Sequence, residues 1–236
     1  MSEKEQNLLI DTLNKLISFF SEFEFELSFR FINTLLWQFK NSKGKSYILN
    51  YLSLIDSPYI SEIKEKMKSV EFSNLIKTLQ CVPVEKQINK RFVLYYGAQG
   101  TGKTTQALAE ADNLCVICHS AMLPSDLLED FTFNDGKATF QPSALAKAMM
   151  EGKPIVLDEL NLLPFDSIRF LQGLLDGKSS FNYKGQTINI KDGFKIIGTM
   201  NLKINGSIYG LPEPLVDRAF EIKEFKLTGK DLLNAL

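Results

Sequence analysis

A glycine-rich segment carries the spacing used by phosphate-binding P-loops. Residues 97–104 read G-x-x-x-x-G-K-T. The glycines let backbone N–H groups surround phosphate oxygens, the lysine reaches the β- and γ-phosphates, and the hydroxyl suits Mg²⁺. An apolar run at 92–96 precedes the segment and a helix-forming run at 105–110 follows it, which is the strand–loop–helix context that the motif requires. The expected nucleotide-binding residues are Gly97, Ala98, Gln99, Gly100, Thr101, Gly102, Lys103, Thr104 and Thr105.

Two adjacent carboxylates end a second apolar run. Asp158 and Glu159 follow Pro154–Leu157, in the manner of a Walker B strand. In open α/β sheets, ligands bind at the carboxyl ends of strands, so these carboxylates are expected beside the phosphates. We therefore expect Asp158 to hold Mg²⁺ together with Thr104, and Glu159 to orient or deprotonate the attacking water.

Alternating strands and helices make up the second part of the chain. Helical segments separate most of the candidate strands, which predicts right-handed crossovers and a mainly parallel five-stranded sheet covered on both faces. The candidate strands are 92–96, 114–118, 154–158, 194–199 and 220–225. The fold class is therefore α/β, with a P-loop core at residues 86–236.

The first part of the chain reads as helical. Apolar residues recur at helical spacing over 7–20 and 23–39, Gly44 interrupts the pattern, and further helices are expected at 57–67 and 71–79. The aromatic stripe along these segments is interpreted as the core of a helical bundle rather than as a ligand site. We therefore expect a helical N-terminal domain at residues 1–85.

Composition and charge set broad limits. The 236 residues are 44% apolar and 23% charged, as in ordinary globular proteins. The net charge of −1 gives the protein no overall positive potential that would attract nucleic acid. The first residues lack the order of a signal peptide, and no apolar run approaches 18 residues. A cytoplasmic protein that does not enter a membrane is expected.

One cysteine cluster allows two further kinds of site. Cys115, Cys118 and His119 form C-x-x-C-H, a haem-attachment pattern, and with Cys81 they could also supply four zinc ligands. The favoured interpretation is structural, because 114–117 reads as a buried strand in which small cysteine side chains pack well.

Three further segments complete a family resemblance. The strand at 194–201 ends in Gly198-Thr199-Met200-Asn201, the segment Leu211–Phe220 contains Pro212, Glu213 and Arg218, and Phe140–Gly152 precedes the Walker B segment Leu157–Pro164. Over roughly residues 90–225 this order resembles AAA+ ATPases of the branch that includes MoxR-like ATPases, dynein-type modules and modification-dependent restriction GTPases.

The resemblance implies a three-layer sandwich, ATP and Mg²⁺ as ligands, and a homo-oligomeric ring, usually a hexamer. It assigns Asn201 as sensor 1, which contacts the water or the γ-phosphate. It assigns Arg218 as the arginine finger that completes a neighbouring subunit's site. Lys103, Glu159, Asn201 and Arg218 are thus the expected catalytic residues.

Two hairpins are expected within this core. Residues 180–190 read as strands around Lys184-Gly185, and 131–140 read as a second hairpin, inserted in a helix after the second strand, with a turn at 134–136. In the resembling family, hairpins like the first line a central pore. The resemblance therefore makes Tyr183 and Lys184 candidates for contact with a protein or DNA substrate, with an inert hairpin as the alternative.

Two departures from the family pattern leave alternatives open. Glu129 follows Asp126-Leu127-Leu128 where the family commonly has glycine, and no helical lid with a sensor 2 arginine is evident before Leu236. Either the N-terminal helices take over the role of the lid or nucleotide closure differs. The same layout also resembles viral superfamily 3 helicases.

The favoured function is a ring-forming ATP hydrolase that couples hydrolysis to remodelling or translocation of a macromolecular substrate. One alternative is a hexameric DNA helicase for viral or plasmid replication. The other is a nucleotide-gated scaffold that recruits partners through its N-terminal helices.

Overall fold

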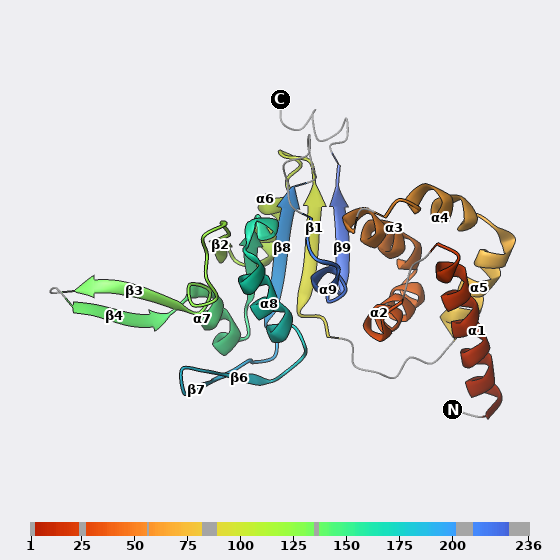
Figure 1. Cartoon of the computed structure of the whole chain (residues 1–236). Helices are drawn as coiled ribbons and strands as arrows, with labels where there is room; N and C mark the ends of the chain where they lie inside the picture. Colours follow the sequence, from red (N-terminus) through yellow and green to blue (C-terminus); the bar gives the residue numbers. More distant parts are fainter. Residues whose placement is uncertain are drawn as a thin grey trace. The chain divides into compact units, whose positions relative to one another are not determined.

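The computed structural model describes residues 3–23, 27–55, 57–81, 89–134, 137–201 and 210–226. The chain forms two compact units, Met1–Ile88 and Asn89–Leu236, and each is described by itself. The helices of the first unit are α1 (Glu3–Ser21), α2 (Phe29–Lys40), α3 (Gly44–Leu54), α4 (Ile60–Lys66) and α5 (Val70–Cys81) (Figure 1). No helix within the described residues is long and apolar enough to cross a membrane.

Aromatic side chains form the core of the first unit. Phe20, Phe31, Tyr51 and Phe72 are each no more than 2% exposed, and the rings of Phe31 and Tyr51 lie 4.5 Å apart. Burial of such large rings is the main source of stability for a small helical unit. The interpretation of the aromatic stripe as a bundle core is confirmed.

The second helix begins later than its apolar pattern suggested. A helix over 23–39 was expected, but α2 begins at Phe29 and Ser28 is its N-cap. The Ser28 hydroxyl accepts a hydrogen bond from the Phe31 N–H at 3.0 Å, which satisfies one of the free donors of the first turn. The expectation of helix from Phe23 was therefore wrong, because a capping side chain outweighs apolar periodicity at a helix start.

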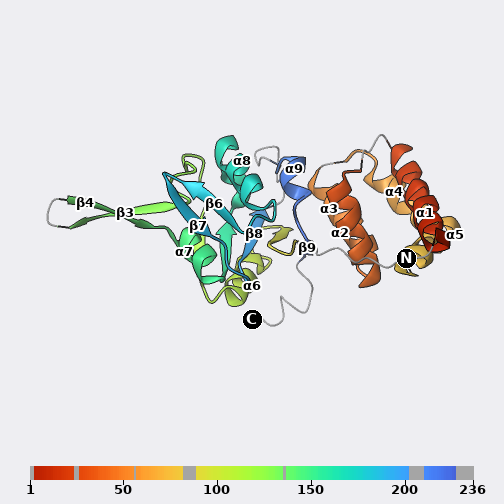
Figure 2. The same ribbon diagram turned by 90° about the horizontal axis from the view of Figure 1, so that it is seen from below.

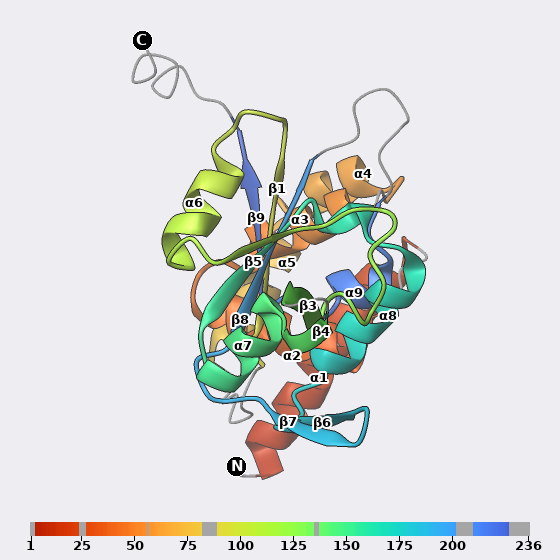
Figure 3. The same cartoon turned by 90° about the vertical axis from the view of Figure 1, so that its left-hand side faces the viewer.

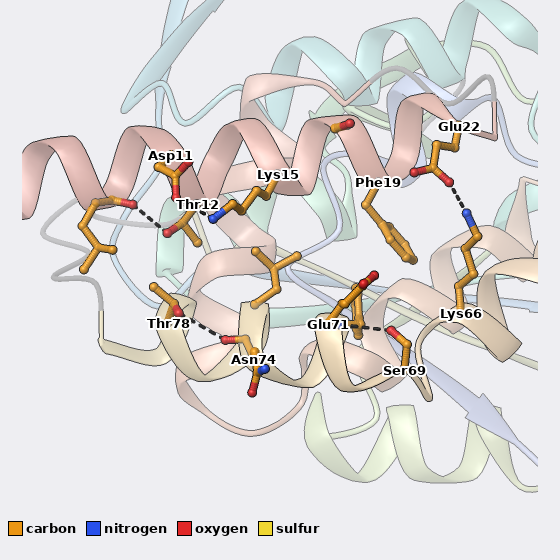
Figure 4. Close-up of a pocket in the computed structure, with 14 residues that line it drawn as sticks. Asp11, Thr12, Lys15, Phe19, Glu22, Lys66, Ser69, Glu71, Asn74 and Thr78 are labelled. Atoms are coloured by element: carbon orange, nitrogen blue, oxygen red, sulfur yellow. Dashed lines mark hydrogen bonds and ion pairs between the residues drawn. The ribbon is translucent and has the colours of Figure 1, made fainter.

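A groove of about 720 Å³ runs between α1 and α5. Figure 4 shows Phe19 of α1 directed toward α5, with polar side chains along both helices. Lys66 forms an ion pair with Glu22, just after the end of α1. Lys15 forms an ion pair with Asp11, one turn earlier in α1, at 2.7 Å. Both lysines that line the groove are thus neutralised within this unit.

A five-stranded sheet forms the centre of the second unit, in the order β2-β5-β8-β1-β9. All four pairings between neighbouring strands are parallel. The strands are β1 (Phe92–Gly97), β2 (Cys115–Ile117), β5 (Pro154–Asp158), β8 (Lys195–Asn201) and β9 (Glu221–Phe225). The five predicted strands and the parallel α/β sheet are confirmed.

Helices cover both faces of this sheet. Figure 3 shows α6 (Lys103–Glu110) and α7 (Ala144–Glu151) on one side, with α8 (Phe165–Leu174) and α9 (Glu213–Val216) on the other. A short 3₁₀ turn, η1 (Leu160–Leu162), connects β5 toward α8. The three-layer arrangement expected for a P-loop core is therefore present.

Two hairpins extend from the core. One pairs β3 (Glu129–Asn134) with β4 (Lys137–Pro142) and projects away from the sheet (Figures 1 and 2). The other pairs β6 (Ser180–Tyr183) with β7 (Gln186–Asn189). Its tip residues Lys184 and Gly185 both have positive φ, 46° and 79°, as a two-residue type I′ turn requires.

Both hairpins were predicted, but the surroundings of the first differ from expectation. Residues 118–128 between β2 and β3 form turns, so the hairpin connects a turn region directly to α7 and is not inserted in a helix. Part of its expected turn, Asp135 and Gly136, lies outside the described residues.

The strand that contains the C-x-x-C-H cluster is less buried than expected. β2 is an edge strand, and Ile117 is 68% exposed while Cys115 is half-buried. Cys118 follows the strand, and its burial raises the pKa of the thiol to about 12. The expectation of a buried strand was wrong for β2, whereas Cys118 does pack as a small buried side chain.

Candidate nucleotide site

A pocket of about 340 Å³ lies where the P-loop meets the ends of β5 and β8. Its volume falls within the usual range of small-molecule sites, about 300–1,000 Å³. The residues that line it are Gln99, Gly100, Thr101, Gly102, Lys103, Thr104, Thr105, Asp158, Glu159, Thr199 and Asn201. The pocket therefore brings together seven of the nine expected P-loop residues, both Walker B carboxylates and the expected sensor asparagine.

Three glycines shape the loop, one because another strand lies close to it and two because of their backbone conformation. Gly97 lies against β9, and a Cβ at this position would come within 2.2 Å of the Phe225 carbonyl oxygen. Gly100 and Gly102 have φ of 77° and 82°, in the left-handed region that side chains disfavour. Gly102 is also the N-cap of α6 and carries no side chain to occupy the first N–H groups of that helix. These N–H groups, with the dipole of α6, form an anion site.

The P-loop lysine is folded onto the loop itself. Lys103 is 5% exposed, and its Nζ donates to the carbonyl oxygens of Gly97 at 3.0 Å and Ala98 at 2.7 Å. Burial lowers the pKa of the Lys103 ammonium, and the nearby Asp158 carboxylate opposes that shift. The ammonium is thus held at the loop, where a phosphate oxygen would give it a stronger, charge-assisted partner.

The central position of β8 brings the carboxylates to the loop. β8 pairs with β5 on one side, where Leu157 is opposite Gly198, and with β1 on the other, where Gly97 is opposite Asn201. The end of β8 therefore lies between the Walker B carboxylates and the P-loop. Asn201 lines the pocket from this position.

A shared acceptor joins the pocket residues. Asp158 Oδ1 accepts a hydrogen bond from the Thr104 hydroxyl at 2.8 Å and a second, short one from the Thr199 hydroxyl. The Thr199 oxygen in turn accepts the Glu159 N–H at 3.2 Å. One threonine side chain, 2% exposed, thereby orients both carboxylate residues.

The backbone of Glu159 is in the left-handed region, with φ 56° and ψ 41°. Such a conformation costs a non-glycine residue about 1–3 kcal/mol and persists only where the surroundings enforce it. The hydrogen bond from the Glu159 N–H to the Thr199 hydroxyl is one such constraint. It fixes the backbone position from which the Glu159 side chain extends.

The sequence pattern pointed to Thr199 only as part of the motif Gly198-Thr199-Met200-Asn201. Its role in the hydrogen-bond network was not predicted. The signal that could have revealed it is strand alternation. Thr199 and Asn201 are two residues apart in β8, so both side chains point to the same face of the sheet. A polar residue on the same face as a sensor, two positions earlier, is a candidate for the same pocket.

Five expected site residues do not line the pocket: Gly97 and Ala98, whose carbonyl oxygens accept from Lys103, and three residues that lie elsewhere, Arg218, Tyr183 and Lys184. Arg218 follows α9, and its guanidinium bonds to α8 and to the Asp176 carboxylate. Tyr183 and Lys184 lie at the tip of the β6–β7 hairpin, where Lys184 Nζ is 5.3 Å from the Tyr183 ring centroid. Lys184 also pairs with Glu129 at 2.6 Å, and this hydrogen bond is the main cause of the raised pKa of the lysine.

Comparisons with known proteins bear on this geometry. A family model described as AAA domain (dynein-related subfamily) matches residues 92–219. Midasin of Giardia intestinalis is 29% identical over 154 residues, which are 60% of this chain and 3% of midasin. The uncharacterized protein YojN of Bacillus subtilis is 27% identical over 165 residues, which are 61% of this chain and 54% of YojN.

Among solved structures, one from Cytophaga hutchinsonii is similar at a TM-score of 0.48 and 20% identity, over 62% of this chain and 45% of that one. The chain spans only part of each of these proteins: slightly more than half of YojN and a small fraction of midasin.

The Thr199 hydroxyl gives a direct test of the shared-acceptor network. Thr199→Val keeps the shape of the side chain but removes its hydrogen bonds to Asp158 and Glu159. Since groups that orient ligating or catalytic residues are commonly worth about 10–100-fold in activity, we expect the rate of nucleotide hydrolysis to fall by that factor while nucleotide binding is retained. Steady-state hydrolysis and equilibrium binding of a fluorescent nucleotide measure the two effects.

Thr199→Ser is the matched control, because it keeps the hydroxyl, and its hydrolysis rate should stay near that of the unsubstituted protein. If Thr199→Val, shown to be folded by its unfolding curve, hydrolyses nucleotide at the normal rate, the network does not contribute to catalysis.

Proposed function

The chain belongs to the AAA+ ATPases, in the dynein-related subfamily of AAA domains, and from this premise we propose that it hydrolyses ATP in a homo-oligomeric ring, a hexamer, to remodel or translocate a macromolecule. Each subunit would bind ATP and Mg²⁺ in the pocket at the P-loop. The neighbouring subunit would complete that pocket with Arg218. We further propose a cytoplasmic location, which suits the free thiols of Cys115 and Cys118.

The observation that carries this proposal is the hydrogen-bond network around Asp158. It brings the P-loop hydroxyl of Thr104, the Walker B carboxylates and the end of β8 into one pocket. Phosphoryl transfer depends mainly on positioning and charge stabilisation, so an arrangement that holds these groups together supports hydrolysis. In this proposal Lys103 and the α6 N–H groups bind phosphate, Asn201 contacts the γ-phosphate or the water, and Glu159 orients or deprotonates the water.

The pocket also offers a suitable set of donors for Mg²⁺. Thr104 Oγ1 and Asp158 Oδ1 are hard oxygen donors 2.8 Å apart, and Mg²⁺ is typically bound by one or two carboxylates together with phosphate oxygens. Thr104 and Asp158 would therefore hold the ion. When bound, Mg²⁺ supplies positive charge that stabilises the phosphate oxygens.

Replacing the proposed base separates binding from turnover. Glu159→Gln keeps the size of the side chain and removes its ability to take a proton, so nucleotide should still bind while turnover falls by about 10²–10⁴-fold. Lys103→Ala is the matched comparison and should lose nucleotide binding itself. Equilibrium nucleotide binding and phosphate release distinguish the two variants, and turnover by Glu159→Gln at a near-normal rate would contradict the assigned role.

The position of Arg218 supports a role in a neighbouring subunit. β9 runs parallel to β1, whose carboxyl end leads into the P-loop, and Arg218 precedes β9. Five strand residues at about 3.3 Å each therefore separate its level in the sheet from the pocket by roughly 16 Å. The arginine lies toward the opposite edge of the sheet, so a contact with nucleotide would have to be made across a subunit interface.

Mixed assemblies test this role. Arg218→Ala should lose most hydrolysis, since arginine fingers are worth about 10³–10⁵-fold in kcat. Addition of Glu159→Gln subunits, which carry an intact Arg218 but an inactive pocket, should restore activity to the Arg218→Ala pockets. Size analysis with a nonhydrolysable ATP analogue would establish the ring in the same samples. If mixing restores no activity in assembled rings, Arg218 does not act between subunits.

The hairpins are the proposed contact with the substrate, and the charges favour a protein over DNA. Lys184 is already paired with Glu129, and the chain carries a net charge of −1, so the tip offers little free positive charge for phosphates. We therefore expect single-stranded DNA to leave the rate of ATP hydrolysis unchanged. Stimulation by DNA would favour the helicase alternative, and slow hydrolysis that neither DNA nor protein stimulates would indicate a nucleotide-gated scaffold.

A further inference from the structure

The Arg218 guanidinium is held by three acceptor residues: Gln172 of α8, Asp176 just after α8, and Pro214 of α9. Its Nε donates to the Gln172 carbonyl oxygen and to Asp176 Oδ1, both at 3.0 Å. Its Nη2 donates to the same Asp176 oxygen at 2.8 Å, and its Nη1 donates to the Pro214 carbonyl oxygen. Hydrogen bonds to three different residues fix both the position of the planar guanidinium and the orientation of its plane.

This contact differs from an ordinary surface ion pair. The side chains of Arg218 and Asp176 are 17% and 33% exposed, so both are largely shielded from water. A single exposed ion pair contributes little, but here two N–H groups meet one carboxylate oxygen and two backbone carbonyls add further acceptors. The arrangement also ties the residues after α8 to the turn that follows α9.

The hydrogen bonds leave part of the guanidinium available. Of its five N–H groups, Nε, one on Nη1 and one on Nη2 are used. The remaining two, one on each terminal nitrogen, have no acceptor within the described part of the chain. Two parallel N–H groups on the terminal nitrogens are the pair with which arginine binds a phosphate in a bidentate manner.

We propose that Asp176 is the positioning residue of the arginine finger: its carboxylate holds Arg218 in the orientation in which the guanidinium reaches the nucleotide of the neighbouring subunit. This inference rests on the proposed role of Arg218 between subunits. In this proposal Asp176 is not itself catalytic and acts on hydrolysis through Arg218. Pre-organisation removes the loss of side-chain freedom that the long arginine would otherwise incur at the transition state.

The first test compares kcat and KM for Asp176→Ala. The pocket of the variant subunit is intact, so KM for ATP should stay unchanged, while kcat should fall by about 10–100-fold, less than the loss caused by Arg218→Ala. Asp176→Asn keeps an acceptor oxygen without the charge and should recover part of the rate. Asp166→Asn, the same substitution at the other end of α8, is the matched control and should behave like the unsubstituted protein.

A double substitution distinguishes positioning from a general structural effect. If Asp176 acts only through Arg218, then Asp176→Ala combined with Arg218→Ala should hydrolyse ATP as slowly as Arg218→Ala alone. Glu159→Gln subunits mixed with Asp176→Ala subunits should restore hydrolysis, because they present a correctly held Arg218 to intact pockets.

The outcomes separate this inference from the function on which it rests. If Arg218→Ala hydrolyses ATP normally, the proposed finger itself fails. If Arg218→Ala is inactive but Asp176→Ala retains the normal kcat, the positioning role alone is overturned. A higher kcat in Asp176→Ala, or a double variant much slower than Arg218→Ala, would equally overturn it.

Discussion

One carboxylate oxygen holds the candidate site together. Asp158 Oδ1 accepts hydrogen bonds from the hydroxyls of Thr104 on α6 and Thr199 on β8, while Asp158 itself ends β5. Hydrogen bonds to an ionised acceptor are about twice as strong as neutral ones, so this atom couples three elements that are separate in the sequence. Thr199 extends the coupling to the strained backbone of Glu159. The positions of Thr104, Asp158, Thr199 and the Glu159 backbone thus depend on one another.

The sheet gives the second unit two functional ends. All five strands of the sheet run in the same direction, so the P-loop and the carboxylates lie together at the carboxyl ends of the strands. Arg218 precedes β9 and lies near the amino ends. One half of the proposed active site therefore faces away from the other within a single subunit. A head-to-tail contact between identical subunits would join the two halves, and such contacts close into rings when their rotation permits. The geometry of a parallel sheet is in this sense the physical basis of the proposed assembly.

Several features could be predicted from the sequence, and the errors among them have clear causes. The five strands and both hairpins follow from apolar runs and turn residues, which are local signals. The helix start at Ser28 was misplaced because one capping hydroxyl decides it. The exposure of β2 was missed because an apolar run does not indicate whether its strand lies at the edge or in the centre of a sheet. The pairing of Glu129 with Lys184, between residues of two different hairpins, has no local signal at all.

By itself, the sequence determined which residues are candidates for binding phosphate and metal and which strands present them, because glycine spacing, strand ends and apolar periodicity are properties of neighbouring residues. Only the tertiary structure decided how they are joined. Thr199 and Asp158 are 41 residues apart, Thr104 and Asp158 are 54 apart, and Arg218 and Asp176 are 42 apart. Such contacts arise from the strand order β2-β5-β8-β1-β9 and from the packing of α8 with α9. Both are set by the burial of whole elements against one another, which no short pattern in the chain encodes.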